Sequence, residues 1–242
     1  MKAPRSRDAL TLLVLLGWAI GGCRPTPSTS GDAKVARDQK ELATIDSKRQ
    51  ARAQELKAMD VRRLAQELSA DSRKGVEPFN SMAYRELVSR GEPVAAELKA
   101  TLSTADASSL LSLLALRSTS PAQYKAVEEG FRIKVLTEAL KNAKLFNTWG
   151  IPHVFWEDAA KALIAEGKAT EGPLLALLDD KREARLWGSE GAVEQQRYRY
   201  RVCDYAWALL SEVRGERISI PEDPAARDRL IEGAKTTSAG KS

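Results

Sequence analysis

The residue types that carry most acid–base and metal chemistry are sparse in this chain of 242 residues. His153 is the only histidine, so a Ser-His-Asp triad would have to use it, and no Gly-x-Ser-x-Gly motif supplies a nucleophilic serine. His153 follows Pro152 in a loop, where a surface or supporting role is its ordinary use. No Cys-x-x-Cys, His-Glu-x-x-His or mixed His/Asp/Glu cluster has the spacing of metal ligands. The sequence therefore predicts no catalytic site and no metal site.

The charged residues likewise indicate neither a catalytic carboxylate pair nor a polyanionic partner. Glu157 and Asp158 are adjacent, so on a helix they would diverge by about 100°, which suits a helix N-terminus better than paired acid–base work. The chain has a net charge of +5, but its first 22 residues contribute three bases and one acid, which leaves +3 without them. A net charge that small is weak evidence for a polyanionic partner, and we expect no binding to nucleic acid.

Aromatic residues are unevenly distributed along the chain. Of the five tryptophans, all except Trp18 fall within residues 149–207, around two long connections at 145–156 and 181–200. Because Trp, Tyr and Arg dominate binding energetics, these loops predict a recognition face. The alternative is a local aromatic core that folds the two loops onto the helices. The candidate binding residues are Trp149, Trp156, Trp187, Tyr198, Arg199 and Tyr200.

The first 23 residues have the organisation of an export signal. Lys2, Arg5 and Arg7 precede a twelve-residue apolar stretch, which is too short to span a membrane. The stretch ends in Ile20-Gly21-Gly22-Cys23, which resembles the lipobox of bacterial lipoproteins. The resemblance implies removal of residues 1–22 and a lipid, including palmitate, on Cys23. A disulfide between Cys23 and Cys203, or a free Cys23 thiol, are the alternatives.

A lipid anchor of this kind implies a location as well as a modification. Stable anchoring takes more than one acyl chain, which a triacylated Cys23 would satisfy without a membrane-spanning helix. Arg24 stands where lipoproteins retained in the inner membrane often carry Asp. By resemblance, we expect the cell envelope, and the outer membrane in a cell with two membranes.

Composition divides the remainder into four segments. Residues 23–32 form a Pro/Ser/Thr-rich flexible tether, and residues 33–70 a charged helical spacer without Gly or Pro up to residue 70. A repeat domain over 71–235 and a disordered tail over 236–242 follow. In the spacer, Leu42 and Ile45 are separated from Leu56 and Met59 by basic residues, so a coiled coil is the less favoured alternative.

The hydrophobic pattern predicts an all-α fold. No alternating Val/Ile/Thr-rich run of strand length occurs, whereas apolar residues recur at helical spacing from Val61 onward. Five leucines lie within residues 110–116, so neighbours should cover that helix on several sides. Ser120-Pro121 has the order of a cap followed by the first helical residue.

Two parts of the chain repeat one another. Seven positions match at an offset of 76, six with the same residue and Val88 with Ile164, and this offset is roughly twice the period of short helical repeats. Gly91 and Gly167 are equivalent in this comparison, and each stands where a helix must stop in a left-handed conformation. Residues 201–209 resemble the second helix of a HEAT repeat. Residues 80–215 are therefore similar to a short, irregular HEAT-like α-solenoid of antiparallel helix pairs. The first members of the matched pairs are Ala83, Leu87, Val88, Gly91, Leu98, Ala100 and Leu102.

These observations favour a membrane-anchored interaction scaffold without catalytic activity. Its expected partners are the membrane and another envelope protein, bound through the loop face 145–201. The alternative is a binder of carbohydrate or cell wall, or an enzyme acting on glycans. That alternative depends on the aromatic residues together with Glu157, Asp158 and Glu190 nearby in the sequence.

Overall fold

The computed structural model describes residues 29–239, with side chains from 34 to 236. The predicted signal peptide over residues 1–22, Cys23 and most of the predicted tether lie outside the described residues. No helix in the described part is long and apolar enough to cross a membrane.

The described chain is mostly helical, which confirms the all-α class. Its elements are α1 (Thr29–Ala58), α2 (Val61–Lys74), α3 (Met82–Arg90), the 3₁₀ turn η1 (Glu92–Val94), α4 (Ala95–Ala100), η2 (Ala107–Ser109), α5 (Leu110–Thr119), α6 (Pro121–Lys125), α7 (Glu129–Lys141), β1 (Gly150–Ile151), β2 (Phe155–Trp156), α8 (Asp158–Ala165), η3 (Gly167–Thr170), α9 (Glu171–Leu175), α10 (Ser189–Tyr198), α11 (Val202–Arg214) and α12 (Pro224–Ala239).

The chain divides into two compact units, the first ending at Lys48 and the second beginning at Arg49. The described part of the first unit is the N-terminal part of α1, up to Lys48, where Leu42 and Ile45 are exposed. This helix begins at Thr29, four residues before the predicted start of the spacer. The remaining features belong to the second unit.

The core of the second unit begins earlier than the sequence predicts. Leu56 and Met59 are buried, and α1 ends at Ala58, two residues before Asp60, whose carboxylate accepts a hydrogen bond from the Arg63 backbone amide. Leu64 and Leu68 of α2 are fully buried in the same core. The described core therefore extends across the predicted boundary at residue 70 between spacer and domain, since α2 packs against α3 and α5.

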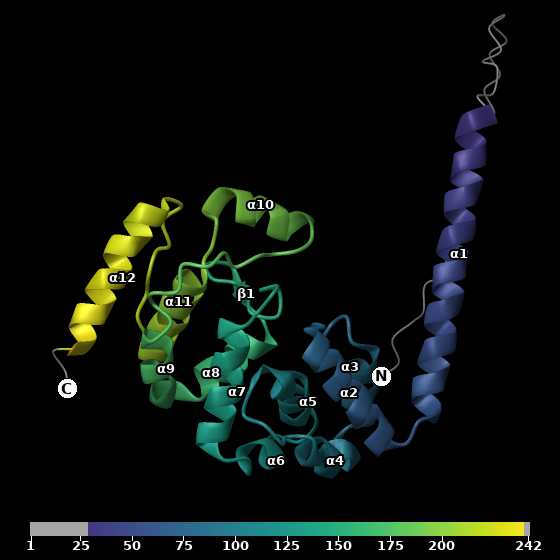
Figure 1. Cartoon of the computed structure of the whole chain (residues 1–242), viewed down its shortest axis with the longest axis horizontal. Coiled ribbons are helices and arrows are strands. Elements are labelled where there is room, and N and C mark those ends of the chain that lie inside the picture. The colour runs from purple at the N-terminus through teal and green to yellow at the C-terminus, as the bar shows by residue number, and fades with distance from the viewer. Residues whose placement is uncertain (1–28, 240–242) are drawn as a thin grey trace, which may run out of the picture. The chain divides into compact units, whose positions relative to one another are not determined.

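Helix α5 lies at the centre of the first half of this unit. Every residue from Leu111 to Leu116 is buried, and α5 contacts α2, α3, α4, α6, α7 and α8 (Figure 1). The expectation that neighbours cover this leucine-rich helix on several sides is confirmed.

The internal repeat is visible in the backbone. Helix α3 leads through Gly91 and η1 into α4, as α8 leads through Gly167 and η3 into α9. The two glycines have φ angles of 71° and 67°, which confirms the positive φ expected at both positions. At Gly91, ψ is −152°, so that residue lies outside the left-handed helical region that we expected.

Helix α11 organises the second half, where it packs against α8, α9 and α12 (Figure 1). Its first turn holds a buried ionic cluster, in which Asp204 contacts Arg201 at 2.9 Å and Arg227 of α12 at 3.0 Å. Helix α12 runs to Ala239, beyond residue 236, where a disordered tail was predicted to begin. Residues 240–242 lie outside the described residues.

The described residues contain one small β-sheet, a hairpin of two strands with two residues each, which the sequence analysis did not predict. Strands β1 and β2 pair antiparallel, with Gly150 opposite Trp156 and Ile151 opposite Phe155. The hairpin connects the loop after α7 to the N-terminus of α8. In β2 the side chains of Phe155 and Trp156 point to opposite faces of the hairpin, because successive residues of a strand alternate between faces.

Candidate functional site

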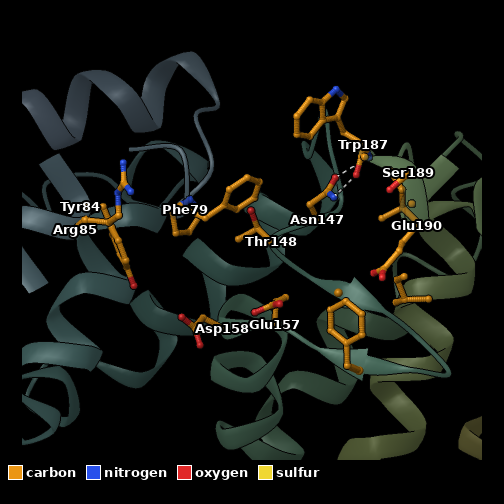
Figure 2. A pocket seen from close by; sticks show the side chains of 17 residues that line it. Phe79, Tyr84, Arg85, Asn147, Thr148, Glu157, Asp158, Trp187, Ser189 and Glu190 are labelled. Carbon is orange, nitrogen blue, oxygen red and sulfur yellow. Dashed lines mark hydrogen bonds between the residues drawn. The ribbon is translucent and has the colours of Figure 1, made fainter. Parts of the chain in front are cut away.

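A cavity of about 500 Å³ opens between the α2–α3 loop, the β1–β2 hairpin and the loop before α10 (Figure 2). We call it the aromatic–acidic groove. It is defined by three aromatic rings and three carboxylates, those of Phe79, Phe155, Trp187, Glu157, Asp158 and Glu190.

The three aromatic rings of the groove are unusually exposed for their type. Trp187 is 65% exposed, Phe79 48% and Phe155 43%. Isolated exposed apolar residues need no explanation. These three rings, however, line one cavity although Phe79 lies more than 70 residues before the other two in the sequence. They present a surface that a ligand could cover.

Asn147 fixes the position of Trp187. Its side-chain amide donates to the Trp187 carbonyl at 2.7 Å, and its side-chain oxygen accepts from the Trp187 backbone amide at 2.8 Å. The adjacent Phe146 backbone amide donates to the Arg185 carbonyl at 2.8 Å, which extends the connection between the two loops. Gly188 then reverses the chain with φ of 96° and leads into α10. Asn147 is therefore a positioning residue, since both the nitrogen and the oxygen of its side-chain amide bond the backbone of Trp187.

Each carboxylate stands at the beginning of a helix. Glu157 is the N-cap of α8, Asp158 opens its first turn, and Glu190 lies in the first turn of α10. In Figure 2, Glu157 and Asp158 lie below the rings of Phe79 and Trp187, and Glu190 enters from the side of α10. Acidic residues stabilise helix N-termini, which explains why the helices begin here.

Tyr84 and Arg85 of α3 complete the groove on the side opposite α10 (Figure 2). Tyr84 is nearly buried, and burial raises the pKa of its hydroxyl, opposed by a hydrogen bond with Ser118 and reinforced by the charge of Asp158. The hydroxyl therefore stays protonated at neutral pH. Arg85 is the cationic side chain among the described residues of the lining.

Gly150 forms part of the floor and tolerates no side chain. Its φ is 91°, and a β-carbon there would lie 2.3 Å from the Phe155 carbonyl oxygen. The Gly150 carbonyl in turn accepts a hydrogen bond of 2.7 Å from the buried Tyr205 hydroxyl. These contacts fix the hairpin, and with it Phe155, onto α11.

A second cavity, of about 360 Å³, lies on the other side of Thr148, which lines both. Glu77 borders this cavity and is almost completely buried. Burial raises the pKa of Glu77, while the backbone amide and hydroxyl of Thr148 act in the opposite direction. Thr148 therefore lies close to Glu77 of the α2–α3 loop, but neither carboxylate oxygen of Glu77 has a hydrogen-bond partner among the described residues.

The structure corrects half of the predicted binding face. Trp149 is 1% exposed, Tyr200 is fully buried and Tyr198 is nearly so. Trp156 is partly buried, with its indole N–H donating to Glu212 at 3.2 Å. Trp187 and Arg199 are exposed, and only Trp187 lines the aromatic–acidic groove.

The buried aromatics form the local core that the sequence left open as an alternative. The rings of Tyr198 and Tyr200 stack at 5.1 Å between centroids, and Tyr200 meets Tyr205 edge-on at 5.8 Å. Phe146 packs against Tyr205 at 4.6 Å. Aromatic pairs of this geometry stabilise folds by roughly 0.5–1.5 kcal/mol each beyond the area they bury. These rings therefore serve packing rather than recognition.

His153 belongs to the edge of this aromatic core. Its Nδ1 lies 2.5 Å from the Tyr200 hydroxyl, and its Nε2 lies 3.5 Å from a carboxylate oxygen of Glu194. Burial lowers the pKa of His153, opposed by the charge of Glu194 and reinforced by that of Arg197. Burial also raises the pKa of Tyr200, so its hydroxyl stays protonated beside the imidazole, and the tautomer of His153 decides which of the two groups donates. The supporting role predicted for His153 agrees with this arrangement.

The groove contains residues that the sequence analysis did not single out. Phe79 was seen within an expected turn, Glu77-Pro78-Phe79-Asn80-Ser81, and an aromatic residue in such a polar turn was the available signal. Asn147 gave no signal, because its partner is forty residues away. Within the described residues, no group of three or more His, Cys, Asp and Glu side chains has the geometry of a metal site.

The chain matches no known protein family, no curated protein and no solved structure.

Proposed function

We propose that this protein is a non-catalytic interaction module of the bacterial envelope, which binds a segment of another protein in the aromatic–acidic groove. The observation that carries this proposal is the groove itself, where three exposed rings and three carboxylates face one cavity of about 500 Å³. Aromatic side chains held in place before binding contribute affinity at low entropic cost. The Asn147 clamp provides that preorganisation for Trp187.

The proposed binding surface differs from the predicted loop face 145–201. Trp149, Tyr198 and Tyr200 are removed from it because they are buried, and Phe79 is added from the α2–α3 loop. A binding surface built from three separate segments on a helical framework fits an interaction role, since repeat-like folds present loops on one face.

We also propose that the second unit is a short, irregular HEAT-like array. The equivalent sequences α3–η1–α4 and α8–η3–α9, each with a positive-φ glycine at the break, support this assignment. Consecutive helices from α2 to α12 pack mainly against near neighbours in the sequence, as repeats do.

Anchoring is the third part of the proposal. We propose that Cys23 carries the lipid and that the protein acts at the membrane surface, on the basis of the Ile20–Cys23 motif alone. Intact mass measurement of the membrane-extracted protein is the test. We expect the mass of residues 23–242 plus a lipid, and an unmodified Cys23 would contradict the proposal.

The binding role is tested by crosslinking in cells. A photoreactive amino acid at position 187 or 79 should capture one partner, and the same residue at position 193 should not. Position 193 is the matched control, because Val193 is 62% exposed on α10 but does not line the groove. Equal capture at 187 and 193, or no capture at 187, would count against the proposal.

A glycan is the second candidate, because the exposed Trp187 ring beside carboxylates also suits stacking on a sugar. Retention of the protein on purified cell wall, lost in Trp187→Ala and kept in Val193→Ala, would favour it. A turnover assay on the same material would reveal any glycan hydrolysis.

A further inference from the structure

The carboxylates of the groove differ from the other acidic side chains around the aromatic loops. Glu157, Asp158 and Glu190 make no ion pair or hydrogen bond with any other described side chain. Nearby surface acids are paired with bases within the fold, as in Asp180–Arg182, Glu183–Arg185, Glu222–Arg197, Asp228–Lys181 and Asp179–Lys235.

This contrast is informative because the chain has bases to spare. It carries 38 Lys and Arg against 33 Asp and Glu, yet only Arg85 reaches the groove lining. The groove is therefore a local negative site on a basic protein. The positive ends of helices α8 and α10 offset about half a charge each, which leaves the three carboxylates in excess.

The aromatic rings specify the kind of cation that would fit. A guanidinium or ammonium group is attracted to the face of an aromatic ring, and a guanidinium also forms paired hydrogen bonds with a carboxylate. Phe79, Phe155 and Trp187 offer exposed rings along the same cavity. A metal ion would use the carboxylates but would gain nothing from three apolar rings.

We infer that the groove recognises an arginine- or lysine-bearing segment of the partner protein, whose cationic side chains lie between the aromatic rings and Glu157, Asp158 and Glu190. This inference rests on the proposed function and adds the chemical class of the ligand. The carboxylates confer selectivity for the cationic segment, and the rings, with Trp187 held by Asn147, supply the contact area.

The test uses the full chain and synthetic peptides in calorimetric titrations. The probes are an uncharged Gly/Ser octapeptide, the same peptide with two arginines, the same peptide with two glutamates, and an N-acetylglucosamine tetramer. We expect the arginine peptide alone to bind, with a Kd that rises as salt is added, because the interacting charges are partly exposed.

Variants separate charge in the groove from charge on the protein as a whole. Glu157→Gln with Glu190→Gln should weaken the arginine peptide at least tenfold. Glu41→Gln with Glu129→Gln is the matched control, since both residues are exposed outside the groove and the net charge changes equally. Single variants and circular dichroism exclude loss of folding as the cause.

The outcomes distinguish this inference from the function on which it rests. Unchanged binding of the arginine peptide in the groove variants, equal binding of the glutamate peptide, or preferential binding of the sugar would overturn the inference. If crosslinking at position 187 still captures a partner in those cases, the interaction role survives. If that crosslink also fails, both are wrong.

Discussion

Asn147 and Trp187 are forty residues apart in the sequence, and the side chain of the first makes two hydrogen bonds with the backbone of the second. One amide thus supplies both a donor and an acceptor, as a neighbouring strand would. This contact connects the loop after α7 to the loop before α10 and orients the most exposed indole of the described chain.

Replacing Asn147 by alanine should release Trp187 without unfolding the domain. The two hydrogen bonds are exposed, so we expect a loss of about 1 kcal/mol in unfolding free energy. Because Trp149 and Trp207 are buried and Trp156 is partly buried, fluorescence quenching by acrylamide should report mainly on Trp187. Quenching that is unchanged between Asn147→Ala and the parent, with Trp187→Phe as the reference, would contradict the clamp.

Gly150→Ala should disrupt the hairpin. The substitution combines a φ of 91° with a β-carbon 2.3 Å from the Phe155 carbonyl oxygen, which is backbone and has little room to move. We expect a loss of more than 3 kcal/mol, larger than the roughly 1–2 kcal/mol that positive φ costs a residue with a side chain.

Gly167→Ala provides the matched comparison for Gly150→Ala. Gly167 has φ of 67° but no atom within 4 Å of the added β-carbon, so only the conformational cost remains. Urea denaturation of both variants should give clearly different midpoints. Similar midpoints would show that the close approach at Gly150 is relieved by movement of the hairpin.

The sequence predicted the helical framework better than the site. Gly91 and Gly167 were located by repetition, and both have positive φ, because a helix stop followed by a reversal is a local requirement that local residues reveal. The burial of the α5 leucines was likewise predictable from the sequence, because five leucines lie within seven consecutive residues. The helical spacing from Val61 onward was recognised, but the composition of residues 33–70 did not reveal that Leu64 and Leu68 share one core with Leu56 and Met59.

The binding face depended on contacts that no local pattern contains. Trp149 and Trp187 both lie in loops, where the sequence has no periodicity to separate buried from exposed positions. Trp149 is 1% exposed and lines the second cavity beside residues of α2 and α7, whereas Trp187 is 65% exposed. Phe79 reaches the same groove from a turn that is more than 60 residues earlier than Asn147.

Stability should fall as the pH falls from 7 to 5 because of His153. Burial lowers the pKa of His153 in the folded protein, while in the unfolded chain it is about 6.5. The unfolded state therefore binds the proton more readily, so this contribution to stability is complete above pH 6.5 and declines below it. The groups facing the imidazole are Glu194, Arg197, Tyr198 and Tyr200.

His153→Gln isolates this effect, since glutamine keeps hydrogen-bonding capacity and does not titrate. Unfolding free energies of the variant measured between pH 5 and 7 should be flatter than those of the parent. A parent whose stability rises toward pH 5 relative to His153→Gln would mean that the contact with Glu194 outweighs burial.

The buried pair Arg132–Glu166 should be sensitive to truncation on one side. Arg132 donates to the two carboxylate oxygens at 3.0 and 2.6 Å, and the Tyr124 hydroxyl donates at 2.6 Å. Both charged side chains are almost inaccessible to solvent. Glu166→Leu leaves the guanidinium buried without its counterion, so we expect a loss of about 3–5 kcal/mol in unfolding free energy.

Acid should weaken the same contact in the parent protein. Burial acts to raise the pKa of Glu166, but hydrogen bonds from Arg132 and Tyr124 outweigh it, and the pKa is lowered. The stabilisation is therefore present above the unfolded pKa of about 4.3 and is lost as the pH falls below it. The double variant Arg132→Met/Glu166→Leu should be more stable than Glu166→Leu alone, because no unpaired charge remains buried. A double variant that loses the sum of the two single effects would show that the pair is not coupled.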